Sequence, residues 1–214
     1  MKAVSAILLA GGRGTRFGSA IPKQFLPLNN KPVALHSFHL FQKISWIKEI
    51  IVVVDTAYSS LFPDTPIAKP GMRRQDSVQN GLALASQTSI LIHDSARPFI
   101  TETECSNLYK TFLEKGAALL ATPVRSTIKL ATHTHRVEKT LPREKLFAAA
   151  TPQICDRVQL KSAFARFPNQ NFTDDTSLLE EAGYPVQIVE GSPRNIKITT
   201  PEDLQLAESL YATL

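Results

Sequence analysis

Short apolar runs alternate along the chain with segments whose apolar residues recur at helical spacing. The apolar runs predict buried strands at Ala6–Ala10, Ile50–Val54, Ser89–His93, Ala117–Thr122 and Val186–Glu190. The helical spacing predicts helices over residues 31–43, 77–85, 101–115, 156–167 and 178–182 and from residue 201 onward. Strands and helices that alternate in this way predict an α/β fold of the Rossmann-like kind, with a mainly parallel sheet and helices on both faces.

Several of the predicted helix starts carry recognisable caps. Thr101 is followed three residues later by Glu104, which is the pattern of a capping box. Pro32 and Pro201 suit the first helical position, and Thr173 or Asp174 suits the cap of the helix over residues 178–182.

The stretch Val124–Leu141 differs from the rest of the chain. It is rich in threonine, alternates polar with apolar residues and has no helical stripe, which predicts an exposed antiparallel hairpin. We expect an arm at about residues 124–143 that packs on a second subunit, because a two-stranded ribbon is rarely stable alone. Residues 143–150 are expected to form a short connection, and Asn195–Thr200 a further short strand.

Length and composition favour one cytoplasmic domain over residues 1–214. The chain is 43% hydrophobic, enough for one sizeable core, and no apolar run reaches the ~18–20 residues of a membrane span. The N-terminal apolar run is better explained as the first strand than as a signal peptide. Cys105 and Cys155 lie far apart and are expected to be buried, without a metal or redox role.

The net charge of +5 suits an anionic ligand. Basic residues are scattered and only 7% of residues are aromatic, so phosphorylated metabolites are a better prediction than nucleic acid.

The segment AILLAGGRGTRFGSAIPK, residues 6–23, is the strongest functional candidate. A strand runs into Gly11, Gly12 and Gly14, where backbone N–H groups can approach a ligand closely, and the cations Arg16 and Lys23 follow. No Gly-Lys-Ser/Thr closes the loop, and the glycine spacing is not that of a dinucleotide fingerprint. The segment suits a nucleoside triphosphate, whose charge the cations would neutralise, although a plain tight turn would also explain the glycines.

Two more segments place polar groups at predicted ligand positions. Gly71 and Ser77 precede or open a helix, and Asp94 and Arg97 follow the strand Ser89–His93 at the edge where open α/β sheets bind ligands. An ordinary cap and a surface ion pair are the simpler alternatives.

Metal ligation is the weaker interpretation of the remaining candidates. His36 and His39, and likewise His133 and His135, have no carboxylate or cysteine at ligand spacing. The acids of TDDTS, residues 173–177, are explained by helix capping, although paired acids near a phosphate site could also hold Mg²⁺.

Taken together, the motifs resemble the 2-C-methyl-D-erythritol 4-phosphate cytidylyltransferases. They occur in order over the whole chain: LLAGGRGTRF, PKQFL, GMRRQDSV, HDSARPFI, ATPVRST, TPQ, TDDTS and NIKITTPEDL. The resemblance implies a nucleotidyltransferase fold and a homodimer joined by a β-arm. It implies transfer of CMP from CTP to the polyol phosphate 2-C-methyl-D-erythritol 4-phosphate, with Mg²⁺ bound mainly through the CTP phosphates, in the non-mevalonate isoprenoid pathway.

The resemblance also implies residue roles. For the nucleotide these are Ala10, Gly11, Gly12, Lys23, Gly71, Ser77, Asp94 and Ser95. Arg16 and Lys23 would stabilise the transition state, and Lys197 would position the attacking phosphate. The polyol phosphate would meet Asp94, Arg97, Thr151 and Lys197, with Thr127 and Arg143 supplied by the partner subunit.

The chain departs from the family pattern at a few positions. Pro70 and Met72 flank Gly71 where the family usually has glycine and an acidic or small polar residue, and Pro70 removes an N–H from the base-binding loop. Ser95 and Thr176 replace small residues. A ribitol-5-phosphate cytidylyltransferase and a non-catalytic nucleotide-binding homologue are the alternatives, and retention of Arg16, Lys23, Arg143 and Lys197 speaks against the second.

Overall fold

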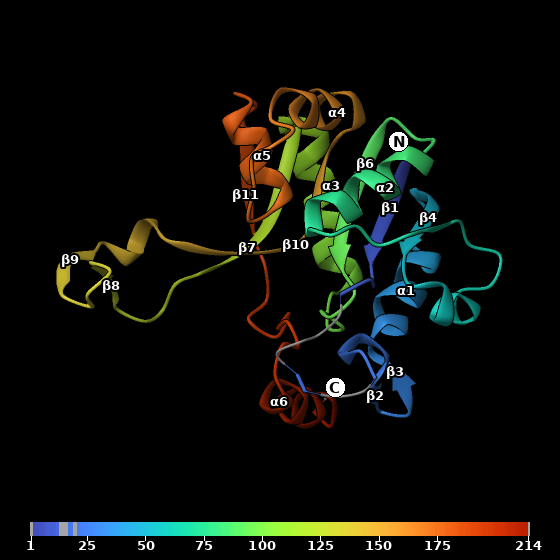
Figure 1. Ribbon diagram of the computed structural model, residues 1–214, viewed down its shortest axis with the longest axis horizontal. Coiled ribbons are helices and arrows are strands. Elements are labelled where there is room, and N and C mark those ends of the chain that lie inside the picture. The colour runs from blue at the N-terminus through green and yellow to red at the C-terminus, as the bar shows by residue number, and fades with distance from the viewer. Residues whose placement is uncertain (1, 13–16, 19–20, 214) are drawn as a thin grey trace.

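A computed structural model describes residues 2–12, 17–18 and 21–213, which form a sheet flanked by helices and a long arm (Figure 1). The seven-stranded sheet has the order β11-β7-β10-β6-β1-β4-β5. Its strands are β1 (Val4–Leu9), β4 (Ile47–Val53), β5 (Ile67–Ala68), β6 (Ser89–Asp94), β7 (Ala117–Pro123), β10 (Phe147–Asp156) and β11 (Val186–Glu190). All neighbouring pairs are parallel except those of β10, which runs antiparallel to both β6 and β7. The predicted Rossmann-like, mainly parallel α/β fold is confirmed.

The helices follow the predicted segments closely. They are α1 (Val33–Lys43), α2 (Arg74–Leu84), α3 (Glu102–Lys115), α4 (Arg157–Arg166), α5 (Asp175–Glu181) and α6 (Pro201–Tyr211). The capping box of Thr101 and Glu104 is present, Asp174 caps α5, and Pro201 opens α6. The expectation for Pro32 is wrong by one position: it is the cap residue of α1 and belongs to the small strand β3 (Lys31–Pro32), which pairs with β2 (Pro27–Leu28).

Successive side chains of the central strands point to opposite faces of the sheet and pack into two cores, one on each face. Ala6 and Leu8 of β1 lie in a cluster with Phe38 and Phe41 of α1 and with residues of α3. Ile7, between them, lies in the other cluster with residues of α2, α4 and α5. The period-two alternation of a strand therefore explains why helices are needed on both faces.

The long strand β10 corrects the sequence interpretation. Residues 143–150 are not simply a connection: only Arg143–Lys145 form a 3₁₀ turn, and the strand begins at Phe147. Three alanines and a proline disguise it, since both residue types are depleted in strands. Pro152 has no N–H to donate, and the pairing of β10 with β7 is interrupted between Ala149 and Gln153.

The expected hairpin projects from the sheet as an arm (Figure 1). Strands β8 (Ile128–Ala131) and β9 (Val137–Leu141) pair antiparallel at its tip. Most residues of the arm are exposed, and none of the described arm residues belongs to the buried core.

Two further observations complete the fold. The expected strand at Asn195–Thr200 is instead irregular, and its Ile198 donates a backbone hydrogen bond to the Ala96 carbonyl oxygen (2.9 Å), just after β6. Within residues 2–12, 17–18 and 21–213, no helix is long and apolar enough to cross a membrane.

Candidate active site

The glycine loop after β1 is held in place by Gln24. Its side-chain Nε2 donates to the carbonyl oxygens of Ala10 (2.7 Å) and Gly12 (2.9 Å), and the residue is almost fully buried. Lys23 and Gln24 belong to the 3₁₀ turn Lys23–Phe25, so this turn carries both the loop's anchor and a predicted catalytic cation. Arg16, predicted as the other catalytic cation, lies outside the described residues.

A second loop, Pro70–Arg73, packs directly against the first. A Cβ atom placed on Gly11 would lie 2.4 Å from the Pro70 ring, so glycine is required there as long as Pro70 is present. Gly71 donates its N–H to the Ser77 hydroxyl oxygen (2.9 Å), which fixes the loop on the first turn of α2. The structure thus brings the predicted nucleotide residues Gly11, Gly71 and Ser77 together, with the Gly71 N–H already bonded inside the protein.

Next to these loops, at the end of β6, a cavity of about 250 Å³ collects charged side chains. Its lining residues are Arg74, Asp94, Arg97, Ala149, Ala150, Thr151, Gln153, Thr173, Asp174 and Lys197. Four predicted acceptor residues, Asp94, Arg97, Thr151 and Lys197, are therefore brought together from the end of β6 and the loop after it, from β10 and from the segment before α6.

Asp94 lies between two cations in this cavity. Its Oδ2 accepts from Lys197 Nζ (2.6 Å) and its Oδ1 from Arg74 Nε (3.1 Å). Burial alone would raise the pKa of Asp94, but Arg74 and Lys197 lower it well below its ordinary value. Asp94 is therefore ionised throughout the physiological range and cannot serve as a proton donor.

Arg74 also reaches Asp175, the first residue of α5. Its Nη2 donates to Asp175 Oδ2 (2.9 Å), and only 3% of the Asp175 side chain is exposed. Burial disfavours the charged form of Arg74, yet Asp175 and Asp94 raise its pKa above the ordinary value. Burial also raises the pKa of Asp175, which Arg74 opposes. Gln153 Oε1 accepts the N–H groups of Asp175 and Thr176 (3.0 Å each), so the helix start is fixed.

Thr151 is held in a buried network at the back of the cavity. Its hydroxyl lies 3.2 Å from His93 Nδ1 and accepts the Asp94 N–H (3.0 Å). His93 Nε2 lies 3.1 Å from the Arg97 carbonyl oxygen, which can only accept, so we assign the proton to Nε2 and the Thr151 hydroxyl donates to Nδ1. Complete burial lowers the pKa of His93 to about 4, so this imidazole is neutral at pH 7.

Arg97 retains an unused donor. Its Nη1 donates to the Asn195 carbonyl oxygen (2.7 Å), while its buried Nε has no partner among the described residues. A buried unpaired donor beside a cationic cavity is suited to an anionic ligand.

The remaining predicted site residues lie elsewhere. Ser95 is buried and its hydroxyl donates to the Leu9 carbonyl oxygen (2.8 Å), which ties β6 to β1. Thr127 and Arg143 are exposed on the arm, and neither lines the cavity; Arg143 donates to the Arg125 carbonyl oxygen (2.9 Å).

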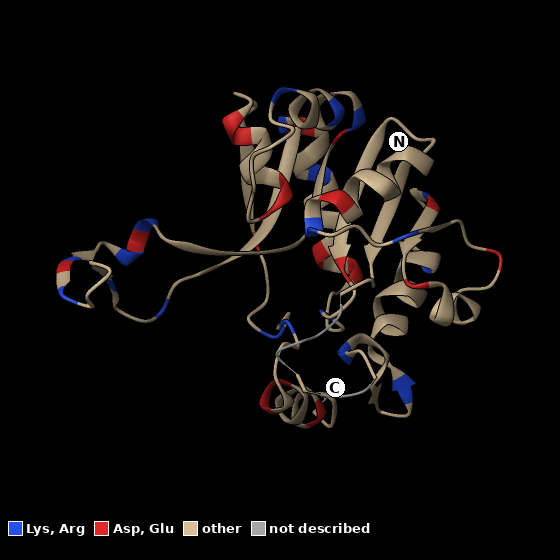
Figure 2. Ribbon diagram, in the orientation of Figure 1, with Lys and Arg blue, Asp and Glu red and all other residues tan. Residues whose placement is uncertain are grey.

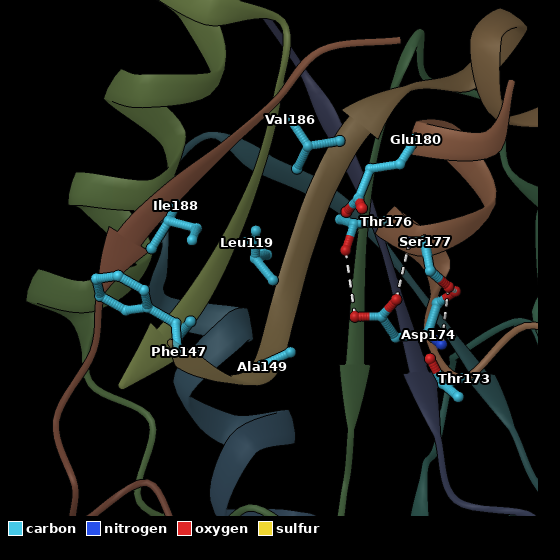
Figure 3. Close-up of a pocket in the computed structure, with 11 residues that line it drawn as sticks. Leu119, Phe147, Ala149, Thr173, Asp174, Thr176, Ser177, Glu180, Val186 and Ile188 are labelled. Carbon is cyan, nitrogen blue, oxygen red and sulfur yellow. Dashed lines mark hydrogen bonds between the residues drawn. The ribbon is translucent and has the colours of Figure 1, made fainter. Parts of the chain in front are cut away.

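A larger cavity of about 430 Å³ adjoins the first and shares Ala149, Thr173 and Asp174 with it. Figure 3 shows its mixed lining: Leu119, Val186, Ile188 and Phe147 come from the sheet, and Thr176, Ser177 and Glu180 from α5. No cation lines this cavity among its described residues, so the smaller cavity is the better site for a phosphate group.

The donor chemistry around the cavity fits a magnesium ion that a substrate carries. Among the residues that the structure describes, no three histidine, cysteine, aspartate or glutamate side chains are grouped as metal ligands. Both oxygens of Asp94 already face cations. Mg²⁺ commonly keeps several waters and binds the phosphate oxygens of a substrate, so a site with few free carboxylate oxygens fits an ion held mainly by phosphate.

The sequence did not single out the residues that hold the glycine loop and the cationic side chains in position. Arg74, Gln153, Asp175 and Gln24 all make buried or partly buried hydrogen bonds to residues that lie far away in sequence. Their only signal was their place inside GMRRQDSV, TPQ, TDDTS and PKQFL, and the helix-capping explanation of Asp175 hid its contact with Arg74.

At the carboxyl ends of the central strands β1 and β6, a glycine loop suited to phosphates lies near a cationic cavity suited to a second phosphorylated molecule. Together with the fold, this arrangement defines the chain as a nucleotidyltransferase of the Rossmann-like class. Basic and acidic residues are interspersed over the rest of the ribbon (Figure 2).

Comparison with known proteins gives the family. The family model of 2-C-methyl-D-erythritol 4-phosphate cytidylyltransferase (IspD) matches residues 4–213, and the chain belongs to this family and is a cytidylyltransferase. The Chlamydia pneumoniae enzyme of that name is 43% identical, over 96% of this chain and 98% of its own length. The chloroplastic enzyme of Oryza sativa subsp. japonica is 41% identical, over 98% of this chain and 74% of its own length.

Solved structures agree. The 4-diphosphocytidyl-2C-methyl-D-erythritol synthase of Anaerococcus prevotii superposes with a TM-score of 0.86 at 25% identity, covering 99% of both chains. The 2-C-methyl-D-erythritol 4-phosphate cytidylyltransferase of Thermus thermophilus gives 0.82 at 28% identity, covering 99% of this chain and 100% of its own. The family and activity expected from the sequence motifs are confirmed, and neither the ribitol-5-phosphate enzyme nor a non-catalytic homologue is favoured.

Proposed function

We propose that the chain transfers CMP from CTP to 2-C-methyl-D-erythritol 4-phosphate. The products are 4-diphosphocytidyl-2-C-methyl-D-erythritol and pyrophosphate, and the step belongs to isoprenoid precursor synthesis by the non-mevalonate pathway. The observation that supports this acceptor class most directly is the cavity at the end of β6, where Arg74, Arg97 and Lys197 lie beside the glycine loop.

The nucleotide would lie along the two packed loops. Ala10, Gly11 and Gly12 would meet its phosphates and ribose through backbone groups, and the nucleotide roles of Asp94 and Ser95 stay predictions. Gly71 and Ser77 would meet the base. Because the Gly71 N–H is bonded to Ser77, the group left for cytosine is the Gly71 carbonyl oxygen, which can accept from the exocyclic amine of the base.

The reaction is an in-line displacement at the α-phosphorus of CTP. An oxygen of the acceptor phosphate forms the new P–O bond, the bond to the β-phosphate oxygen breaks, and pyrophosphate leaves with the electron pair. The acceptor phosphate is already ionised, so no general base is required. Arg16 and Lys23 would stabilise the charge that develops on the α-phosphate, which makes positioning and electrostatics the main source of catalysis.

The acceptor would be held by Asp94, Arg97, Thr151 and Lys197. Lys197 would position the attacking phosphate, and the unpaired Nε of Arg97 would contribute a further donor. Since Thr151 donates its hydroxyl hydrogen to His93, it can offer only an acceptor to the substrate, which suits a polyol hydroxyl.

Magnesium ion would enter with CTP and supply neutralisation of the triphosphate charge. The Asp94 carboxylate is already bonded to Arg74 and Lys197. Triphosphate oxygens would therefore be the main ligands of the magnesium ion.

We further propose a homodimer in which Thr127 and Arg143 of each arm serve the other subunit's cavity. Both residues are exposed and lie outside the cavity of their own chain. The compartment we propose is the cytoplasm, in keeping with the two unpaired, buried cysteines, since disulfides are rare in a reducing compartment.

The decisive assay is pyrophosphate release by the purified protein with CTP, Mg²⁺ and each polyol phosphate in turn. We expect turnover with 2-C-methyl-D-erythritol 4-phosphate and a much lower rate with ribitol 5-phosphate, with the product identified by its ³¹P diphosphate resonances. Equal or faster turnover of ribitol 5-phosphate would contradict the proposed acceptor.

Removing the cation at Lys23 tests the proposed transition-state contact. The variant Lys23→Ala should lower kcat by roughly 10²-fold or more, because one preorganised charge contact to the developing charge is lost. Lys110→Ala on α3 removes a lysine that does not line the cavity and serves as the control. A folded Lys23→Ala variant with near wild-type kcat would remove Lys23 from the mechanism.

Base choice tests the loop around Gly71. CTP should be preferred over UTP, since cytosine but not uracil carries an exocyclic amine that can donate a hydrogen bond to the Gly71 carbonyl oxygen. CTP should also be preferred over ATP and GTP, because their purine bases are larger. Initial rates of pyrophosphate release with the four triphosphates measure this preference. Similar rates for CTP and UTP would exclude recognition of the amine.

A further inference from the structure

The carboxylate of Asp94 is divided between two cations. Lys197 Nζ lies 2.6 Å from Oδ2, and Arg74 Nε lies 3.1 Å from Oδ1. Among the described residues, Asp94 is the only carboxylate within ion-pair distance of Lys197. Arg74 and Lys197 compete for the negative charge of Asp94. The strength of the Asp94–Lys197 ion pair in the free protein therefore depends on whether Arg74 also binds Asp94.

Arg74 is itself held from a second side. Its Nη2 donates to Asp175 Oδ2 at 2.9 Å, and Asp175 is almost fully buried at the start of α5. Gln153 bonds the backbone of Asp175, so this second carboxylate is a fixed anchor. Arg74 is also the first residue of α2, directly after the loop that packs on Gly11. The Arg74 guanidinium thus connects the end of β6 with the start of α5.

We propose that Arg74 is a positioning residue for the acceptor site: it holds Asp94 in place so that the Lys197 ammonium remains available to the polyol phosphate. This inference rests on the proposed function. It adds a residue that touches neither the base nor the α-phosphate and that acts on the acceptor through Asp94.

The physical argument concerns competition between two anions for one ammonium. With Arg74 present, Asp94 balances parts of two positive charges, and a phosphate dianion can draw Lys197 away from it. Without Arg74, Asp94 is a buried carboxylate with Lys197 as its only cation, and the pair tightens because a buried charge needs a partner. The acceptor phosphate would then have to break a full ion pair.

The geometry also requires arginine. A guanidinium presents Nε and Nη2 to two carboxylates in fixed directions, whereas an ammonium is a point charge on a flexible stem. Lysine at position 74 would keep the positive charge of the cavity, yet it would not hold Asp94 and Asp175 together.

The central variant is the double substitution Arg74→Gln with Asp175→Asn. Arg74→Gln alone leaves Asp175 buried without its cation and is expected to fold poorly, since an uncompensated buried charge is strongly destabilising. The second substitution removes that charge, so the double variant keeps the fold while Asp94 loses its arginine. Asp175→Asn alone leaves Arg74 wholly to Asp94. Arg166→Gln, which removes an arginine bonded to the Ala182 carbonyl oxygen outside the cavity, is the control.

The first readout needs no activity. The rate at which an amine-selective reagent modifies Lys197 in the free protein is measured by competitive labelling and mass spectrometry. We expect Lys197 to be labelled about tenfold more slowly in the double variant, and at least as fast as wild type in Asp175→Asn. An unchanged labelling rate in the double variant would overturn the proposal.

The second readout separates positioning from a general loss of positive charge. In the double variant, KM for the acceptor should rise about tenfold while KM for CTP changes little. Arg74→Lys should show the same rise although it keeps the charge. Near wild-type acceptor KM in Arg74→Lys, or equal rises for both substrates, would overturn the proposal. A wild-type protein without turnover would refute the proposed function, and the labelling experiment would still decide the role of Arg74.

Discussion

The central sheet and the arm are built from opposite kinds of sequence. Every residue of β6 is buried, and its side chains enter the two cores on either face. Among the residues that the structure describes, strands β8 and β9 pair only with one another, and most of their residues are exposed. The sheet is stabilised by burial within one chain, whereas the arm offers surface that only another molecule can cover. The arm is thus one continuous segment of the sequence, set apart from the segments that build the two cores.

The sharpest test of this difference compares one apolar deletion in each region. Ile92→Ala in β6 removes a fully buried side chain and should lower the free energy of unfolding by about 2–5 kcal/mol. Leu130→Ala in β8, where 41% of the residue is exposed, should change it by about 0.5 kcal/mol or less at concentrations where subunits are separate. Urea unfolding measures both. Equal losses would mean that the arm packs on its own chain's core.

Subunit mixing tests whether the arm completes a neighbouring site. Arg143→Ala should lower activity roughly 10²-fold by removing a guanidinium suited to phosphate. Mixed with Lys23→Ala, it should regain activity, because a mixed dimer has one site with both defects and one with neither. Recovery toward about half of a wild-type dimer is the upper limit for such a mixed dimer. No recovery after demonstrated subunit exchange, or a fully active monomer, would exclude shared sites.

A pH titration contrasts a histidine of the sheet with one of the arm. Burial lowers the pKa of His93 to about 4 in the folded chain, below its ordinary 6.5, so the unfolded chain binds the extra proton between these values. This contribution to stability is complete above pH 6.5 and is lost as the pH falls toward 4, by about 2 to 3 kcal/mol.

The measurement is the free energy of unfolding from about pH 7 to about pH 4.5 for three proteins, a range that spans most of this titration. His93→Gln should remove most of this slope relative to wild type, whereas His133→Gln in the arm should keep it. If the slope persists in His93→Gln, another group is responsible for it.

The sequence was a good guide where pattern and structure depend on neighbouring residues. Apolar runs indicated β1, β4 and β6, and the caps at Thr101 and Pro201 are local features that a short motif specifies. The sequence was a poor guide where a distant partner decides the outcome. β10 was missed because its alanines and Pro152 have little strand preference. It forms because it lies between β6 and β7 and pairs antiparallel with both of them.

The candidate site divides in the same way. Its glycines and cations stand out because their chemistry is unusual in a loop, and Asp94, Arg97, Thr151 and Lys197 do converge on one cavity. Arg74 could not be singled out, since its partners are 20 and 101 residues away in sequence. The roles of Thr127 and Arg143 stay predictions, because they depend on a second chain.

The two ends of the arm are clamped together where it leaves the sheet. Pro123, at the end of β7, pairs with Phe147, at the start of β10, so residues 124–146 form a loop whose ends are fixed beside each other. In polymer terms such a loop costs little to lengthen or shorten, about 0.6 kcal/mol for each doubling of its length. A tight turn in its place would save only on the order of 1–2 kcal/mol of closure entropy. The arm can therefore vary in length and sequence almost independently of the sheet, and a change of partner need not disturb the fold.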